Sequence, residues 1–145
     1  MVMKQLYFED IQEGQGIPVL EKKPDNVQFF MYIAVHWLTH RIHYDYKFCT
    51  EDQGLPDVVT PGTMPGDWYG QMLLNWIGER GKLKKLSFQL RGFSVPGDIL
   101  SCQGKVIRKS LNDGQHIVEC ELSMINQRGE NIVPGAATVV LPSRD

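Results

Sequence analysis

Several features that would restrict the class of protein are missing from this sequence of 145 residues. No stretch approaches the roughly 20 apolar residues that are needed to cross a bilayer. The opening residues, MVMKQLYFEDIQEG, turn acidic without the apolar run of a signal peptide. We therefore expect no membrane association and a cytoplasmic protein. Repeats, low-complexity tracts and linkers are also lacking, so residues 1–145 are expected to form a single domain.

Cysteine is scarce, and its placement argues against both disulfides and a metal centre. Cys49, Cys102 and Cys120 are odd in number and show no CxxC spacing, which indicates reduced, buried thiols. We expect no metal and no cofactor. An excess of charge of one sign is also lacking, because 15 basic and 17 acidic residues give a net charge of -2. Without a basic stripe, nucleic acid is not an expected partner.

Apolar residues do recur at helical spacing, first in the stretch that follows Asp25. This aspartate is suited to cap a helix that we predict over residues 27–39. The apolar and aromatic positions of this helix are Phe29, Phe30, Ile33, Ala34 and Trp37. Residues 7–16 have the character of an exposed lead-in that ends on glycine. Prolines and glycines in residues 40–60 favour loop and short turns.

The second helical stretch is the more apolar one. It is predicted to begin at Gly62 or Pro65 and to end near Glu79. One apolar stripe is formed by Trp68, Met72, Leu73 and Trp76. We expect this helix to be buried, and we expect the tryptophans, Trp37 included, to lie in the core or in a dimer contact. Hydrophobic residues make up 42% of the chain, which is enough for one core without disulfide or metal staples.

The remainder of the chain alternates apolar and polar residues, which is the period of half-buried strands. Four strands are predicted, over residues 84–93, 99–109, 116–126 and 133–141. Asn112-Asp113-Gly114 is a strong hairpin signal between the second and the third, and turns at residues 95–98 and 127–130 separate the others. An apolar helix followed by an antiparallel meander favours strands that wrap round the helix. We therefore predict an α+β chain with the hot-dog arrangement.

Four segments, taken in order, are similar to segments of one known family. Residues 8–14 (FEDIQEG) resemble its opening Phe-x-Asp-x-x-x-Gly. Residues 40–45 (HRIHYD) resemble its active-site segment, especially in the mesaconyl-CoA hydratase branch. Residues 55–62 (LPDVVTPG) resemble the run before its central helix, and residues 93–98 (FSVPGD) resemble its Phe-x-x-Pro-x-x-x-Gly-Asp strand boundary with a shorter gap. The chain thus resembles the MaoC-like (R)-specific enoyl-CoA hydratases and dehydratases, whose fold is the hot-dog.

The resemblance implies a reaction and two of the groups that perform it. Such enzymes add water across the double bond of an α,β-unsaturated acyl thioester, or remove it, with an acyl-CoA as the partner molecule. It implies His43 as the acid/base and the backbone N–H of Gly62 as the donor to the oxyanion on the thioester carbonyl. Glycine lets the thioester approach the backbone closely. Weaker candidates lie in the same segments: His40 and Asp45 for catalysis, and Arg41 and Thr60 for substrate binding.

One departure from the family pattern bears on the mechanism. Better-known members have an aspartate five residues before the histidine, the mesaconyl-like branch has asparagine, and this chain has Leu38. Leucine can neither accept a proton nor orient water. The histidine that precedes the helix glycine in the family is likewise replaced, by Pro61. Three residues are candidates for a new partner of the acid/base: Asp45, His40 and Asp67.

Two other interpretations stay open. The chain could be a non-catalytic or half-site subunit of a heteromeric MaoC-like hydratase, or an acyl-CoA-binding module. In length and in its Trp76-Ile77-Gly78 helix end it is similar to the small subunits of steroid side-chain hydratases, which pair with a different MaoC-like chain. Thioesterase chemistry on the same fold would need a carboxylate near the central helix, for which Asp67 is the candidate. A hot-dog sheet leaves an open edge and an exposed helix flank, so we expect a homodimer or a heteromer.

Overall fold

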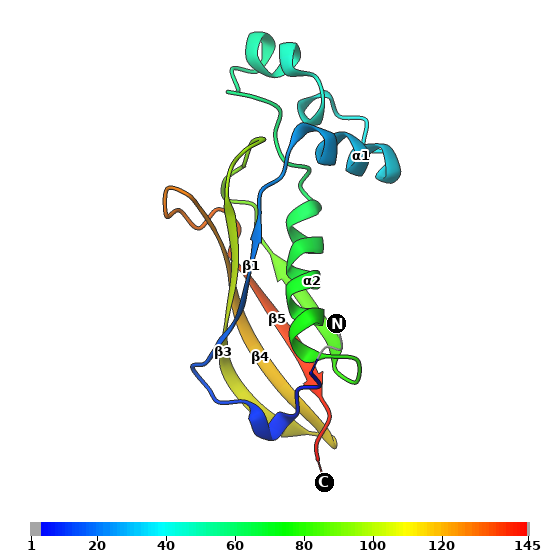
Figure 1. Cartoon of the computed structure of the whole chain (residues 1–145), viewed down its shortest axis with the longest axis vertical. Coiled ribbons are helices and arrows are strands. Elements are labelled where there is room, and N and C mark those ends of the chain that lie inside the picture. The colour runs from blue at the N-terminus through cyan, green and yellow to red at the C-terminus, as the bar shows by residue number, and fades with distance from the viewer. Residues whose placement is uncertain (1–3, 145) are drawn as a thin grey trace.

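The computed structural model describes residues 4–144 as a five-stranded antiparallel sheet and several helices (Figure 1). The strands are β1 (Gly16–Lys22), β2 (Lys82–Phe88), β3 (Leu100–Asn112), β4 (Gln115–Asn126) and β5 (Gly135–Leu141). Their spatial order is β1-β3-β4-β5-β2, so that β1 and β2 form the two edges. The sheet curves round one long helix, as Figure 1 shows. The predicted α+β arrangement of an antiparallel sheet around a central helix is confirmed.

The central helix, α2 (Met64–Ile77), is held by burial of one continuous face against the sheet. Its buried residues are Met64, Pro65, Trp68, Tyr69, Met72, Leu73, Trp76 and Ile77. Gly66 lets the helix approach β2 closely, because a Cβ there would lie 2.5 Å from the ring of Phe88. The helix ends at Gly78, whose positive φ of 74° is readily adopted by glycine alone. The predicted burial is confirmed, and the helix ends slightly earlier than the predicted Glu79.

The first helix, α1 (Asn26–His36), begins at the predicted cap. The Asp25 carboxylate accepts a hydrogen bond of 2.8 Å from the Gln28 N–H. The predicted extension of this helix to residue 39 is wrong, because Trp37 adopts a left-handed conformation with φ of 53°. A left-handed residue cannot continue a right-handed helix, and the chain turns away at this point.

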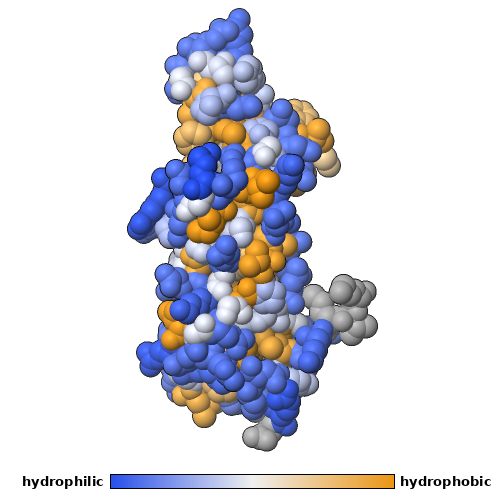
Figure 2. Space-filling model, turned by 60° about the vertical axis from the view of Figure 1, so that its left-hand side comes forward, coloured by the Kyte–Doolittle hydropathy of each residue, from blue (hydrophilic) through white to orange (hydrophobic). Residues whose placement is uncertain are grey.

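Most of the apolar surface of α1 is exposed. Its buried residues are Phe29 and Ile33, whereas Phe30 and Val35 face outwards. Trp37 is 83% exposed and therefore lies outside the core, so a dimer contact is the part of its prediction that stays open. Figure 2 shows hydrophobic patches (orange) at the upper end of the molecule, where α1 lies in Figure 1. Exposed apolar surface of this kind is typical of sites that contact a ligand or another chain.

Between the two helices the chain forms an extension, the overhang (residues 37–60), which projects beyond the end of the sheet (Figure 1). It contains a 3₁₀ turn, η2 (Arg41–His43), and a π-helical turn, η3 (Phe48–Asp52). The buried Cys49 thiol donates to the Ile42 carbonyl oxygen at 3.2 Å, and the Val59 N–H donates to the same oxygen at 2.9 Å. The predicted irregular stretch over residues 40–60 is therefore confirmed, and these bonds give it a defined shape.

The edge strands differ from the prediction. No strand is predicted over the residues of β1. Pro18 and a register shift against β3 between Ile17 and Leu20 interrupt the alternating pattern there. β2 ends at Phe88, whereas the predicted strand covers residues 84–93. Beyond that point the chain faces Pro134, which has no N–H to donate, and the regular ladder with β5 ends. Residues 89–93 therefore lie outside the regular ladder, although the N–H groups of Gln89, Arg91 and Gly92 still donate to the carbonyls of Pro134 and Ile132.

The interior is apolar and its thiols are unreactive. The three cysteines are free and buried, as predicted. Burial raises the pKa of the Cys102 thiol to about 11 and that of the Cys120 thiol to about 12, so both are protonated at neutral pH. Within residues 4–144, none of the helices has the length and apolar character required to cross a membrane.

Replacement of Tyr69 by phenylalanine tests the packing of α2 on the sheet. The Tyr69 ring is fully buried, and its hydroxyl donates to the Val133 carbonyl. Tyr69→Phe leaves this carbonyl without that donor, so urea denaturation should show a loss of about 1–3 kcal/mol in the free energy of unfolding. The control is Tyr46→Phe, whose side chain is exposed and whose effect should stay within about 0.5 kcal/mol. Equal effects of the two substitutions would contradict this packing.

Candidate active site

His43 ends the η2 turn of the overhang and is half-buried. Its Nδ1 atom lies 2.9 Å from the Val59 carbonyl oxygen. A carbonyl oxygen can only accept a hydrogen bond, so the neutral ring carries its proton on Nδ1 and a lone pair on Nε2. The overhang therefore holds His43 in the tautomer that can take up a proton through Nε2.

Gly62 lies immediately before the N-terminus of α2, where backbone amides lack partners within the helix. The first turn is closed by the Met64 N–H, which donates to the Pro61 carbonyl at 3.0 Å. Within residues 4–144 the Gly62 N–H has no acceptor. A Cβ at this position would lie 3.0 Å from Cδ1 of Leu90, so Leu90 packs closely against the glycine. The positive end of the helix dipole favours negative charge at the same point.

His43 and Gly62 line one cleft of about 460 Å³, which we call the helix cleft. Its lining comes from the overhang, the start of α2 and the segments after β2 and before β5: Ile42, His43, Val59, Thr60, Gly62, Pro65, Leu90, Arg91, Gly92, Phe93, Ser94, Ile132 and Val133. The fold thus brings together the residues predicted as acid/base and as oxyanion donor. Most of the lining is apolar, which strengthens hydrogen bonds to a charged intermediate.

Thr60 also lines the helix cleft, but its polar groups are engaged by Ser94. Its Oγ1 lies 2.5 Å from Ser94 Oγ and 3.1 Å from the Ser94 carbonyl oxygen. The Thr60 N–H donates to the same carbonyl at 2.9 Å, and Ser94 is buried. In the structure Thr60 therefore binds the segment that contains the Val59 carbonyl to Ser94.

Arg91 is a residue of the helix cleft that the sequence analysis does not single out. Its side chain is exposed, and its Nη2 lies 3.3 Å from Gln89 Oε1, so it brings a positive charge to the cleft. The residue lies within the stretch predicted as strand, where no motif marks it. Its position in the cleft becomes evident only from the structure, in which residues 89–93 lie outside the regular ladder.

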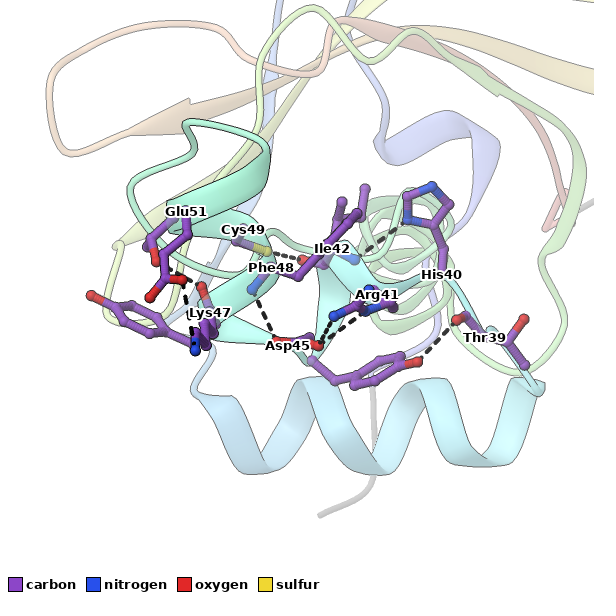
Figure 3. Close-up of polar contacts among 12 residues, drawn as sticks. Thr39, His40, Arg41, Ile42, Asp45, Lys47, Phe48, Cys49 and Glu51 are labelled. Carbon is purple, nitrogen blue, oxygen red and sulfur yellow. Dashed lines mark hydrogen bonds and ion pairs between the residues drawn. The ribbon is translucent and has the colours of Figure 1, made fainter.

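Arg41 and Asp45 form an ionic cluster within the overhang (Figure 3). Nε and Nη2 of Arg41 donate to Oδ2 of Asp45 at 3.0 and 2.8 Å, and the guanidinium lies 4.3 Å from the centre of the Phe48 ring. The Phe48 N–H donates to Oδ1 at 3.0 Å. This N–H, followed by the guanidinium, lowers the pKa of the Asp45 carboxyl below its ordinary value. Asp45 thus stabilises the overhang, while the Val59 carbonyl accepts from His43.

The remaining residues of the active-site segment offer no acid to His43. The His40 ring centre lies 6.1 Å from that of His43, and its Nδ1 accepts a hydrogen bond of 3.4 Å from the Ile42 N–H, as Figure 3 shows. Leu38 is half-buried just after the end of α1, and its N–H donates to the Ile33 carbonyl at 2.9 Å. Position 38 therefore contributes an apolar side chain where the family resemblance leads one to expect a polar one.

Asp67, the third candidate partner, joins the two helices to each other. Its Oδ2 accepts a hydrogen bond of 2.5 Å from the hydroxyl of Tyr32 on α1, and that hydroxyl lies 2.9 Å from Thr63 Oγ1. Burial, and next the hydrogen bond to Asp67, raise the pKa of the Tyr32 hydroxyl. Tyr32 therefore stays protonated and keeps α1 attached to the start of α2.

A second cleft of about 580 Å³, which we call the aromatic cleft, opens beside α1. Its lining residues are Asn26, Val27, Phe30, His43, Tyr44, Tyr46, Asp57 and Val58. His43 lines both clefts, and neighbours in the sequence divide between them: Val58 lines the aromatic cleft and Val59 the helix cleft. His43 is thus the lining residue that the two clefts share.

Comparison with solved structures identifies the fold. The chain is similar to the R-hydratase PhaJ1 from Pseudomonas aeruginosa, with a TM-score of 0.86 and 16% identity over 97% of this chain and 88% of that one. It is similar to an (R)-hydratase from A. caviae involved in PHA biosynthesis, with a TM-score of 0.80 and 19% identity over 92% and 99%. A third likeness is the ChsH1-ChsH2 complex from Mycobacterium tuberculosis, with a TM-score of 0.78 and 17% identity over 90% and 98%. At these identities the likeness shows the fold alone, which is the hot-dog of the MaoC-like (R)-hydratases.

A comparison with protein-family models gives the particular family. The model of the hydroxyacyl-thioester dehydratase type 2 family matches residues 11–98, which is more than half of the chain and includes both His43 and Gly62. The chain belongs to this family. None of the curated proteins compared with the chain matches it.

Exchange of Asp45 for asparagine tests the ionic cluster through its dependence on pH. Because the pKa of Asp45 in the fold lies below its ordinary value of 3.8, the carboxylate contributes stability that is fully present above that value. The contribution is lost as the pH falls through the lower pKa of the folded state. Asp45→Asn should therefore lower the urea midpoint near neutral pH, and the difference from the wild type should vanish as the solution is acidified.

Glu51→Gln is the control for this exchange. Glu51 lies 3.8 Å from Lys47 in an exposed ion pair of the same overhang. Exposed pairs contribute little, so the urea midpoint near neutral pH should change less than in Asp45→Asn. A difference between Asp45→Asn and wild type that persists unchanged in acid would contradict the assigned role of the carboxylate.

Proposed function

We propose that this chain hydrates an α,β-unsaturated acyl thioester of the enoyl-CoA type, or dehydrates the corresponding hydroxyacyl thioester. The observation that carries the proposal is the helix cleft, in which His43 and the unpaired N–H of Gly62 line the same apolar space. Family membership supports the reaction class, because the family is that of the hydroxyacyl-thioester dehydratases. Hydration and dehydration are the two directions of one equilibrium and use the same groups.

In the hydration direction, Nε2 of His43 removes a proton from water while the water oxygen attacks the β-carbon. The electrons of the double bond move onto the thioester oxygen, where the Gly62 N–H and the helix dipole stabilise the negative charge. The imidazolium then returns the proton to the α-carbon as the carbonyl re-forms. A hydrogen and a hydroxyl have been added, and His43 is neutral again. One imidazole performs both transfers in turn, so no carboxylate is needed at position 38.

The surroundings of His43 support this cycle. The Nδ1–H donates to the Val59 carbonyl both when the ring is neutral and when it is protonated, so the ring keeps its orientation throughout. Thr60 fastens the segment of that carbonyl to Ser94. His40, Arg41 and Asp45 contribute in this proposal by shaping the overhang that carries the histidine.

The alternative is a half-site or non-catalytic subunit of a heteromeric MaoC-like hydratase. Leu38 favours this alternative, because it lies where an acidic group would assist the histidine. One of the similar structures is a complex of two named chains, ChsH1 and ChsH2. The exposed apolar residues of α1 offer a surface for a partner, which could also be a second copy of this chain. In a heteromer this chain would bind the acyl-CoA and the partner would provide the acid.

Substitution of His43 tests the proposal directly. His43→Ala should lower kcat/KM for hydration of crotonyl-CoA by ~10² to 10⁴, which is the usual loss on removal of a general acid/base. His43→Asn should be equally inactive but more stable, because its amide nitrogen takes the place of Nδ1 and can still donate to the Val59 carbonyl. His36→Ala, on the exposed side of α1, should retain the wild-type rate. Full activity of the purified His43→Asn protein would refute the assignment.

The same assay separates the two candidate functions. If wild-type protein fails to hydrate enoyl-CoA but binds CoA thioesters, the half-site alternative is favoured. If it hydrates crotonyl-CoA by itself, the alternative of a half-site or non-catalytic subunit is excluded.

Gly62→Pro tests the oxyanion donor, since proline has no N–H. Loss of one such donor should lower kcat by ~10² to 10³. Gly62→Ala is the matched control, because it adds the same Cβ near Leu90 but keeps the N–H, and it should lose less than about tenfold. Equal activities of the two variants would show that the Gly62 N–H does not act on the thioester.

A further inference from the structure

The aromatic cleft supports an inference that rests on the proposed function and extends it. The proposed reaction uses only the helix cleft, yet His43 lines both clefts. A thioester whose reacting carbons lie beside His43 therefore extends in two directions. One direction receives the acyl group and the other receives the carrier. The linings and charges of the two clefts differ, and these differences distinguish the ends of the substrate.

The charges assign the carrier to the helix cleft. Carriers of acyl thioesters such as CoA bear phosphate groups and are anionic. The helix cleft has Arg91 at its edge, whereas the aromatic cleft contains the half-buried carboxylate of Asp57. Oδ1 of Asp57 accepts from the Val58 N–H at 2.7 Å, which holds the carboxylate in place. An anionic arm is favoured beside Arg91 and disfavoured beside Asp57.

The lining of the aromatic cleft suits a flat apolar group. Three aromatic rings from two elements face it: Phe30 on α1, and Tyr44 and Tyr46 on the overhang. Phe30 is 62% exposed and Tyr46 is 60% exposed, so this surface stays in contact with water until a ligand covers it. Aromatic rings prefer stacked or edge-to-face contacts with other rings, which contribute beyond the burial of area.

The space beneath α2 is occupied by side chains. Tyr69, Leu73 and Ile77 fill the region between the helix and the sheet and are fully buried. The aromatic cleft, at about 580 Å³, is within the range of roughly 300–1,000 Å³ that is typical of small-molecule sites. A four-carbon acyl group would leave most of this volume and most of the aromatic surface uncovered.

We propose that the aromatic cleft is the acyl-binding site and that the acyl group of the substrate ends in a planar ring. The ring packs against Phe30, Tyr44 and Tyr46, and the unsaturated carbons next to the thioester lie at His43. The carrier leaves through the helix cleft past Arg91. The substrate class is thus an aryl or cyclic enoyl thioester rather than a short linear one.

Equilibrium binding of saturated thioesters tests this assignment without turnover. Calorimetry would compare 3-phenylpropanoyl-CoA with nonanoyl-CoA, a linear thioester with the same number of acyl carbons. The wild type should bind the phenyl ester about tenfold more tightly. Phe30→Ala should bring the ratio of the two dissociation constants close to one. Met31→Ala is the matched control, because Met31 is an exposed residue of α1 outside the lining of both clefts, and it should keep the wild-type ratio.

The outcomes separate this inference from the function on which it rests. Equal binding of the two esters by the wild type, or a ratio unaffected by Phe30→Ala, would overturn the acyl assignment even if hydration is observed. Selective binding of the phenyl ester without any hydration would support the acyl assignment and contradict only the catalytic proposal. If neither ester binds, both are overturned.

Discussion

Burial of α2 against the curved sheet determines where the N-terminus of this helix can lie, and the candidate site is assembled at that end. The buried face of α2, from Met64 to Ile77, fixes the position of the helix on the sheet. Gly66 allows contact with the Phe88 ring, and the Tyr69 hydroxyl binds the Val133 carbonyl, in a segment that itself lines the helix cleft. The amide of Gly62 is therefore placed by the hydrophobic core, far more than by contacts of its own.

The overhang depends on that placement and adds the histidine to it. The Cys49 thiol and the Val59 N–H meet at the Ile42 carbonyl, and Thr60 is bound to Ser94. These bonds hold the η2 turn against the extended segment of residues 58–60. His43 consequently finds its partner in a backbone carbonyl. A group that is held before substrate arrives needs little reorganisation during the reaction, which is why such preorganisation favours catalysis.

Much of this architecture could be predicted from the sequence. The stripe from Trp68 to Trp76 indicated a buried helix, and Asn112-Asp113-Gly114 indicated the hairpin between β3 and β4. Both signals are local and depend on spacing alone. Resemblance to a family pointed to His43 and Gly62, and the fold places both in one cleft.

Other features depend on contacts that no sequence pattern indicates. Trp37 ends α1 through its own left-handed backbone, although its side chain fits the apolar periodicity. β1 is interrupted by Pro18 and a register shift, and Arg91 lines the helix cleft in a segment that lies outside the regular ladder. The acceptor of His43 is a main-chain oxygen, which every residue possesses. For the same reason Asp45, two residues from His43, was a reasonable candidate in the sequence but binds Arg41 in the structure.

The central claim is that one chain holds a thioester between the Gly62 N–H and Nε2 of His43. The most direct measurement is an NMR titration of the ¹⁵N-labelled chain with 3-phenylpropanoyl-CoA, in which the resonances of these two nitrogens are followed. The account predicts that the Gly62 amide moves downfield, as expected when it binds a carbonyl, and that Nε2 of His43 shifts at the same ligand concentration while Nδ1 keeps its hydrogen bond. Shifts confined to residues outside both clefts, with these two nitrogens unchanged at saturation, would contradict it.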